Sequence, residues 1–317
     1  MIKTLALVGD SGFGIGFGHL SRLISLYEKF ATTNDVCFHG KFEYTDSFAR
    51  IINQHEISLD CICRKQPQTV ITDTYKNEVI TNLNFSGEYK LVQLIDEISP
   101  KFFADAYIKV SPIKNWSPLN PQALIKNFDN DPLLRRQFFE SQKYSNSKSL
   151  ETKKLLVIVG GSENSKLLLS AIADSVKDLN GKNQISFATN ETHLHFFAKK
   201  LMYEVVPYEE NFQSMISSYD LVISAAGVTA WELLASNANC ILVSTASNQN
   251  YQLEYLRKNF DVRGLEFSSS NHSFSRDLKI MILDTLHNAQ SDKNNYRSKV
   301  SDGVTKVSEW LVSNNLI

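Results

Sequence analysis

The sequence predicts an α/β protein built from two doubly wound domains that face each other across a cleft. Its 317 residues are about twice the length of a typical domain. Short apolar segments alternate with amphipathic ones in both halves, and each half opens with an apolar segment, a glycine turn and a helical pattern. We place the boundary in the polar stretch 141–153, giving domains of residues 1–148 and 149–317, with the last helix free to cross back.

The expected elements follow from the spacing of apolar residues. Short runs of apolar residues are typical of buried parallel strands, and apolar residues three and four apart are typical of helices. The expected strands are residues 4–8, 35–38, 70–72, 91–95, 155–159, 185–188, 221–224 and 240–244. Helices are expected directly after the first glycine segment and over residues 48–54, 167–179, 230–236, 251–258 and 299–312.

Composition excludes several classes of protein. The chain has 33 basic and 34 acidic residues and a formal charge of −1, which gives no electrostatic reason to expect nucleic acid or an anionic membrane as partner. We find no secretory signal and no apolar stretch long enough to span a membrane. The four cysteines lack zinc-site spacing, so we expect reduced thiols in a cytoplasmic protein without metal or cofactor. Oligomeric state is not predicted.

Five of the 13 glycines lie within residues 9–18, directly after the first expected strand. Gly16 and Gly18 lead into the first helix, whose starting N–H groups favour an anion. His19 begins this helix, where the dipole should keep the ring neutral and able to accept a proton; Arg22 is expected to hold a phosphate or carboxylate. A dinucleotide fingerprint fits poorly, because His19 replaces its last glycine and no acidic residue ends the second strand. The alternative is that His19 only caps the helix or packs.

Acidic and phenolic side chains follow the third and fourth expected strands. Asp73 and Tyr75 come after one, and Asp96 and Glu97 after the other. Because ligands of α/β proteins bind at the carboxyl ends of parallel strands, we expect Asp73, Tyr75 and Asp96 to face a ligand. Capping of a following helix is the alternative for the carboxylates.

The segment after strand 221–224 has the pattern of a phosphate site. Small residues there leave room for a pyrophosphate at the start of the next helix, which Thr229 or a neighbour is expected to cap. Glu232, about one turn along, is placed to accept hydrogen bonds from both hydroxyls of a ribose. Its alternative role is a charge interaction with the helix dipole. We therefore expect Ala226, Gly227, Thr229 and Glu232 to bind substrate.

Two further segments of the second half are expected at the same site. Gly161 and Ser162, in a strand-to-helix turn, are expected to donate backbone N–H groups to the phosphates. Asn248 and Gln249, which follow the strand at residues 240–244, carry amides suited to a sugar or phosphate.

Taken in chain order, these segments resemble a known family. The blocks are Ile15-Gly-Phe-Gly-His19-x-x-Arg22, Asp73-x-Tyr75, Asp96-Glu97, Pro132-Leu-Leu-Arg135, Gly160-Gly161-Ser162 and Ser224-Ala-Ala-Gly227 with Glu232, Asn248 and Gln249. The pattern resembles the UDP-sugar hydrolases of pseudaminic acid biosynthesis, which release UDP from a UDP-2,4-diacetamido-2,4,6-trideoxy-altropyranose. This family shares the GT-B fold with the glucosaminyltransferase of peptidoglycan synthesis.

The resemblance implies that UDP binds mainly to the second domain, with its pyrophosphate at the Gly227 helix. It also implies that His19 activates the attacking water without a metal and that Tyr75 lies near the sugar. The chain departs from the family at Thr74, where a histidine is frequent, and at Lys76, where a glycine is frequent. Both positions approach the sugar in that family, so substrate identity is the expectation they affect most.

Three functions are therefore compared. The first is a nucleotide-sugar hydrolase that inverts the anomeric carbon by attack of water, with His19, Asp73 and Tyr75 as the catalytic residues. The second is a GT-B glycosyltransferase that uses the same donor and base but transfers the sugar to a saccharide acceptor. The third is a non-catalytic protein that binds a nucleotide sugar, alone or as a subunit of a biosynthetic assembly.

Overall fold

The structure is a computed structural model. It describes residues 3–12, 15–43, 49, 52–53, 57, 66–76, 78–79, 85, 87–96, 100, 102–139, 152–158, 165–179, 181, 183–189, 192–206, 212–268, 270–271, 273–288 and 295–317. Contacts divide the chain into two compact units. The first contains Met1–Tyr44, Phe48–Arg136 and Ser301–Ile317, and the second contains Gln137–Val300. The boundary expected at 148/149 lies outside the described residues.

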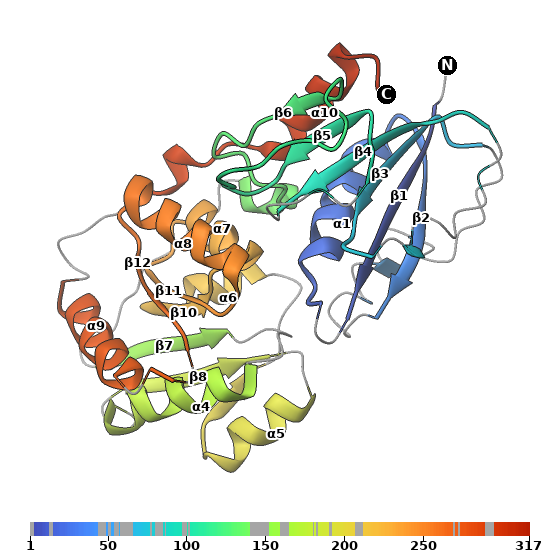
Figure 1. Ribbon diagram of the computed structural model, residues 1–317. Helices are drawn as coiled ribbons and strands as arrows, with labels where there is room; N and C mark the ends of the chain where they lie inside the picture. Colours follow the sequence, from blue (N-terminus) through green and yellow to red (C-terminus); the bar gives the residue numbers. More distant parts are fainter. Residues whose placement is uncertain are drawn as a thin grey trace. The chain divides into compact units, whose positions relative to one another are not determined.

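The first unit is a parallel sheet in the order β2-β1-β3-β4-β5-β6. Its strands are β1 (Thr4–Ser11), β2 (Asp35–Phe42), β3 (Thr69–Asp73), β4 (Lys90–Ile95), β5 (Ala106–Lys109) and β6 (Leu124–Lys126). The helices α1 (Gly18–Phe30) and α10 (Gly303–Ser313) lie together against this sheet (Figure 1). The last segment of the chain therefore completes the first unit.

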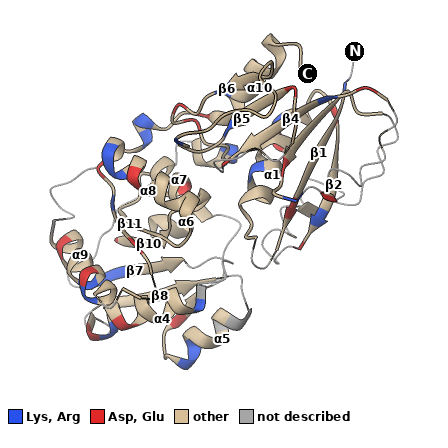
Figure 2. Ribbon diagram, viewed as in Figure 1, with Lys and Arg blue, Asp and Glu red and all other residues tan. Residues whose placement is uncertain are grey.

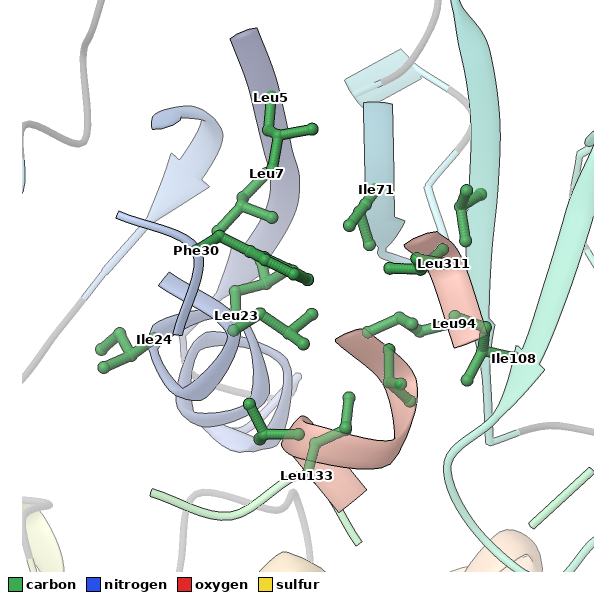
Figure 3. Packing of buried hydrophobic residues seen from close by; sticks show 14 of the residues in the cluster. Leu5, Leu7, Leu23, Ile24, Phe30, Ile71, Leu94, Ile108, Leu133 and Leu311 are labelled. Carbon is green, nitrogen blue, oxygen red and sulfur yellow. The ribbon is translucent and has the colours of Figure 1, made fainter. Parts of the chain in front are cut away.

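The core of the first unit explains how α1 is held. Leu20, Leu23 and Ile24 recur at helical spacing, and all are fully buried. They belong to one cluster with Ile71 of β3 and Leu311 of α10 (Figure 3). Each such side chain contributes roughly 1.5–3 kcal/mol by leaving water. This packing fixes the start of α1 at the carboxyl ends of the strands.

The second unit repeats the architecture in the order β12-β11-β10-β7-β8-β9, again parallel. Its strands are β7 (Lys153–Ile158), β8 (Asn183–Ala188), β9 (Glu204–Val206), β10 (Leu221–Ala225), β11 (Cys240–Ser244) and β12 (Arg263–Glu266). Its α-helices are α4 (Ser165–Val176), α5 (Thr192–Lys200), α6 (Phe212–Ser217), α7 (Val228–Ala235), α8 (Ser247–Phe260) and α9 (Phe274–Asn288). Short 3₁₀ helices cover Arg136–Phe139, Lys177–Leu179 and Arg297–Lys299.

Each sheet has a point at which the strand order reverses. It lies between β1 and β3 in the first unit and between β7 and β10 in the second. Ligands of doubly wound proteins bind outside the carboxyl ends of the strands at such a point. Each unit thus has one topologically favoured binding region.

The predicted α/β class and the doubly wound topology are confirmed. Four strands of three or four residues were not predicted: β5, β6, β9 and β12. Figure 2 shows charged segments of both signs in each unit, as the near-zero formal charge implies. Within the described residues, no helix combines the length and the apolar character needed to cross a bilayer. The expectation of reduced thiols is wrong for Cys37, which is disulfide-bonded, whereas Cys240 is free and buried.

Candidate functional site

Charged side chains converge at the carboxyl ends of β1, β3 and β4. Asp10 lies near the end of β1, Asp73 ends β3 and Asp96 follows β4. Gly9 pairs with Asp73 in the parallel register, so the first two carboxylates are brought to neighbouring strand ends. His19 and Arg22 reach the same place from the first turns of α1. The group lies at the carboxyl ends of the strands, where Asp73 and Asp96 are expected from the sequence, and at the topological switch point that the strand order reveals.

The His19 ring lies between two carboxylates. Its Nδ1 is 3.2 Å from Oδ1 of Asp10, a hydrogen-bond distance, and its Nε2 is 3.8 Å from Oδ1 of Asp73. Only 3% of His19 is exposed. A proton on Nδ1, donated to Asp10, leaves the lone pair of Nε2 to accept a second proton. Asp10 is a site residue that the sequence expectations above do not include; its sequence signal is its place at a strand end, which it shares with Asp73 and Asp96.

The protonation of His19 differs from the expectation. Burial alone would lower the pKa of the imidazole, but the Asp73 charge and the hydrogen bond with Asp10 outweigh burial and raise it above the ordinary 6.5. The expectation of a neutral ring, inferred from the helix dipole, is therefore wrong. The dipole would lower the pKa of His19, whereas the carboxylates around the ring raise it. A partial charge at a helix end is smaller than two full carboxylate charges at contact distance.

Arg22 joins the strands to the helix. Its Nε donates to Oδ2 of Asp73 at 2.7 Å, and its Nη2 donates to Oδ1 of Asp73 and pairs with Oδ2 of Asp96, each at 2.9 Å. Burial disfavours the charged guanidinium, yet the Asp73 and Asp96 charges raise its pKa, so Arg22 stays a cation. Of the two kinds of partner expected for Arg22, phosphate or carboxylate, the structure shows two carboxylates of the chain itself. Arg22 therefore holds Asp73 and Asp96 in position.

Tyr75 contacts both Asp96 and His19. Its hydroxyl donates to Oδ1 of Asp96 at 2.5 Å. Its ring stands edge-on to His19, with centroids 4.5 Å apart and an interplanar angle of 78°. Burial and then the Asp96 charge raise the pKa of Tyr75, so the phenol stays protonated and acts as a hydrogen-bond donor rather than a base. Burial raises the pKa of Asp96, but the charge of Arg22 outweighs burial and the pKa is lowered overall, so the carboxylate stays charged.

The two positions that depart from the resembled family contact Asp10. The Thr74 side chain hydrogen-bonds to Asp10, and Nζ of Lys76 is 3.5 Å from its Oδ2. Burial raises the pKa of Asp10, but the hydrogen bonds with His19 and Thr74 and the charges of His19 and Lys76 lower it overall. The resemblance connects Thr74 and Lys76 with the sugar, whereas in the structure both contact Asp10, the carboxylate that holds His19.

The glycine segment brings β1 close to its neighbours. A Cβ at Gly9 would lie 2.9 Å from the backbone oxygen of Asp73, so the strands could not approach as they do. Gly16 adopts φ +86° and bonds to Gly12 through the backbone, which closes the turn before α1. Phe17 is the N-cap and makes no side-chain capping bond, and Gly18 is the first helical residue. The first N–H groups of a helix lack intrahelical partners, so this turn offers donors for an anion.

In the second unit, the start of α7 lies at the switch point after β10. Gly227 is the N-cap of α7, so of the expected candidates, Thr229 or a nearby residue, a nearby residue caps the helix and Thr229 itself lies inside it. Nε2 of Gln252 donates to the carbonyls of Ala226 (2.8 Å) and Gly227 (2.7 Å). Ala226 is fully buried and its N–H donates to Val243, so both of its backbone groups are engaged, contrary to the role expected for it in substrate binding.

Gln249 and Asn248 lie in the first turn of α8. Oε1 of Gln249 accepts from the backbone N–H of Thr245 at 3.0 Å, and its Nε2 lies 3.8 Å from where a Cβ on Gly227 would be. Oδ1 of Asn248 accepts from the N–H of Gln249. Glu232 is buried in α7. Gln249 and Gly227 thus lie close together, and their role in binding substrate stays a prediction; Gly161, Ser162 and Glu97 lie outside the described residues.

Comparisons with known proteins agree with this architecture. Residues 155–307 match the model of the "Glycosyltransferase family 28 C-terminal domain". A Clostridium perfringens UDP-N-acetylglucosamine--N-acetylmuramyl-(pentapeptide) pyrophosphoryl-undecaprenol N-acetylglucosamine transferase is 26% identical over 185 residues, 56% of this chain and 51% of that protein. The chain thus spans about half the length of this curated relative.

Solved structures extend the likeness over the whole chain. Acinetobacter baumannii MurG matches with a TM-score of 0.58 at 13% identity, covering 98% of this chain and 99% of its own. Anabaena Alr3699/HepE, solved in complex with UDP and glucose, matches with a TM-score of 0.64 at 13% identity and 99% coverage of both chains. The chain therefore has the GT-B fold, and its C-terminal part is similar to the family 28 glycosyltransferase C-terminal domain.

Proposed function

We propose that this protein is a glycosyltransferase that moves a sugar from a UDP-sugar to the hydroxyl group of a saccharide acceptor. The observation that carries the proposal is the Asp10–His19 pair at the switch point of the first unit. The similarity of the second unit to a glycosyltransferase domain and the likeness to a UDP-bound protein support it. The sequence favours hydrolysis first and transfer second, whereas the comparisons support transfer better.

The proton in this reaction moves along a short path. Nε2 of His19 accepts the proton of the acceptor hydroxyl while the acceptor oxygen bonds to the anomeric carbon. The bond from that carbon to the β-phosphate oxygen breaks, UDP leaves with the bonding pair, and the anomeric configuration inverts. Asp10 holds Nδ1–H and stabilises the imidazolium, and Asp73 adds a second negative charge near Nε2. Tyr75 and Asp96 are proposed to orient the sugar.

The second unit is proposed to hold the nucleotide. The N–H groups at the start of α7 would stabilise the negative charge that develops on the diphosphate. Gln252 fixes the carbonyls of Ala226 and Gly227, which keeps that turn preorganised. Glu232 is proposed to accept hydrogen bonds from the ribose hydroxyls, with Thr229, Asn248, Gln249, Gly161 and Ser162 nearby in the nucleotide site; Gly16 and Gly18 are proposed to meet the sugar side of the substrate.

Hydrolysis is the second candidate, and the burial of His19 favours it. A ring exposed by only 3% is more easily reached by water than by a bulky saccharide. In that case the proposed substrate is a UDP-linked diacetamido-trideoxy sugar of nonulosonic acid biosynthesis, and the proposed location is the cytoplasm. The same residues serve both reactions, because only the nucleophile differs.

One assay separates the candidates. The purified protein is incubated with a panel of UDP-sugars, with and without saccharide acceptors, and UDP release is followed. Release that requires an acceptor supports transfer, and equal release without any acceptor supports hydrolysis instead. A protein that binds UDP but releases none under either condition contradicts both and supports a non-catalytic role.

The pH dependence of the reaction follows from the His19 environment. Because the base must be unprotonated, kcat/KM is expected to rise with pH and to level off only above the raised pKa of His19, hence above 6.5. Initial rates measured across the neutral range give the midpoint. A rate that falls with rising pH through this range would mean that protonated His19 is the active form.

Glu232 is expected to contribute to nucleotide affinity. Replacing Glu232 with alanine should weaken UDP binding by about 1–3 kcal/mol, because two ribose hydroxyls lose their acceptor. Calorimetric titration with UDP measures the effect, and Glu266→Ala, at an exposed position of β12, serves as the control. Equal UDP affinity in the two variants would remove Glu232 from the nucleotide site.

A further inference from the structure

Residues 73–76 connect every part of the charged group in the first unit. Asp73 binds Arg22 and faces His19, and Tyr75 binds Asp96 and packs against His19. Lys76, from the same loop, places its Nζ 3.5 Å from Oδ2 of Asp10. Oδ1 of that same carboxylate contacts Nδ1 of His19. Lys76 and His19 therefore share one carboxylate.

We propose that Lys76 is a positioning residue that acts through Asp10 to set how readily His19 accepts a proton. The ammonium competes with the imidazole for the negative charge of Asp10. Its contact with one oxygen also fixes the rotation of the carboxylate, so that the other oxygen faces Nδ1. This inference deepens the proposed function, since it concerns the proton acceptor of that reaction.

The charged and polar groups that face His19 show why a positive charge beside Asp10 matters. From β1, β3 and the residue after β4 come the carboxylates Asp10, Asp73 and Asp96; from α1 comes the guanidinium of Arg22; from the loop after β3 comes the phenol of Tyr75.

Arg22 does not balance these charges alone. It is buried and binds Asp73 and Asp96. Lys76 supplies a positive charge beside Asp10. Without it, the imidazolium would gain in stability and the proton acceptor would weaken near neutral pH.

Lys76 differs from Arg22 in exposure. Its side chain is 45% exposed, whereas that of Arg22 is 7% exposed. An exposed ion pair is screened by salt, while a buried one is screened much less. The influence of Lys76 on His19 should consequently depend on ionic strength, which distinguishes it from the influence of Arg22.

The test is a titration of the His19 ring by NMR, with histidine labelled selectively and the His19 signal assigned by its loss in His19→Gln. In Lys76→Met the midpoint is expected to rise by about half a pH unit relative to wild type. In Lys76→Arg it is expected to stay at the wild-type value, because the charge is kept. Raising the salt to about 0.5 M should shrink the difference between wild type and Lys76→Met.

The matched control is Lys90→Met. Lys90 makes an exposed pair with Asp105, at the amino end of β4 and hence at the opposite edge of the sheet, and its loss should leave the His19 midpoint unchanged. A midpoint in Lys76→Met that equals that of Lys90→Met, or that falls, overturns the inference. If Lys76→Met does not fold and the His19 signal of the folded protein is absent, Lys76→Gln is measured instead. A His19 midpoint in Lys76→Gln that equals that of Lys90→Met, or that falls, then overturns the inference.

A kinetic measurement separates this inference from the proposed function. If the reaction occurs as proposed, the midpoint of kcat/KM against pH should move in Lys76→Met by the same amount and in the same direction as the NMR midpoint. A raised NMR midpoint in a protein that turns over no UDP-sugar supports the role of Lys76 and contradicts the proposed function. An unchanged NMR midpoint in an active enzyme contradicts Lys76 alone.

Discussion

Replacing His19 with glutamine is expected to lower kcat by roughly 10²–10⁴-fold while leaving UDP affinity nearly unchanged. Glutamine keeps a hydrogen-bonding group beside Asp10 but accepts no proton at its nitrogen. The acceptor hydroxyl, or water, would then have to attack without losing its proton to the protein. UDP affinity should persist because the nucleotide is assigned to the second unit. Steady-state rates and calorimetric titration of UDP measure the two quantities separately.

The control for this variant is His287→Gln. His287 lies near the end of α9 in the second unit, where its Nδ1 contacts the carbonyl of Leu283, and its replacement should leave kcat at the wild-type value. Wild-type kcat in His19→Gln would eliminate His19 as the base and with it the observation on which the proposed reaction depends. A large loss of UDP affinity would instead show that the nucleotide site includes the first unit.

The sequence predicts the positions of the site residues better than their partners. Strand ends are readable from apolar runs, so the sequence predicts Asp73 and Asp96 at strand ends and His19 within one residue of the start of α1 at Gly18. Their pairing depends on the order of the strands. Because β3 lies beside β1, Asp73 meets Arg22 and His19, and no local pattern contains that order.

The same limit explains the error in the protonation of His19. A helix dipole is a local property and can be inferred from the sequence around residue 19. The two carboxylates that reverse its effect come from β1 and β3, nine and 54 positions away. The short strands β5 and β12 were missed for a related reason: four residues are too few to show a period, and pairing with longer neighbours forms them.

Replacing Arg22 with methionine is expected to destabilise the first unit by about 3–5 kcal/mol at neutral pH. The loss leaves Asp73 and Asp96 buried and charged without the guanidinium that binds both of them. Lysine at this position keeps the charge but not the two-pronged geometry, so Arg22→Lys should lie between methionine and wild type. Hydrogen exchange of the amides of β1, β3 and β4 reports the free energy of opening in this unit.

Acid provides a second test of the same pair. In wild type the pKa of Asp96 is held below its ordinary value of 3.8 by Arg22, so the stability that this carboxylate contributes is present above that value and is lost as the pH falls through the lowered one. Without Arg22, burial favours the neutral form of Asp96. Protonation of Asp96 at lower pH therefore reduces the destabilisation of Arg22→Met. The difference in stability between wild type and Arg22→Met should therefore shrink as the pH is lowered toward 4.

The matched control is Arg276→Met, which removes an exposed arginine paired with Asp277 in the second unit. Exposed pairs contribute about 0–1 kcal/mol, so this variant should exchange like wild type. Wild-type protection of β1 and β3 in Arg22→Met would mean that Asp73 and Asp96 find other partners or take up protons at neutral pH. In either case Arg22 would not be the residue that keeps the carboxylates beside His19 charged. Other groups in the site would then have to account for the raised pKa of the His19 ring.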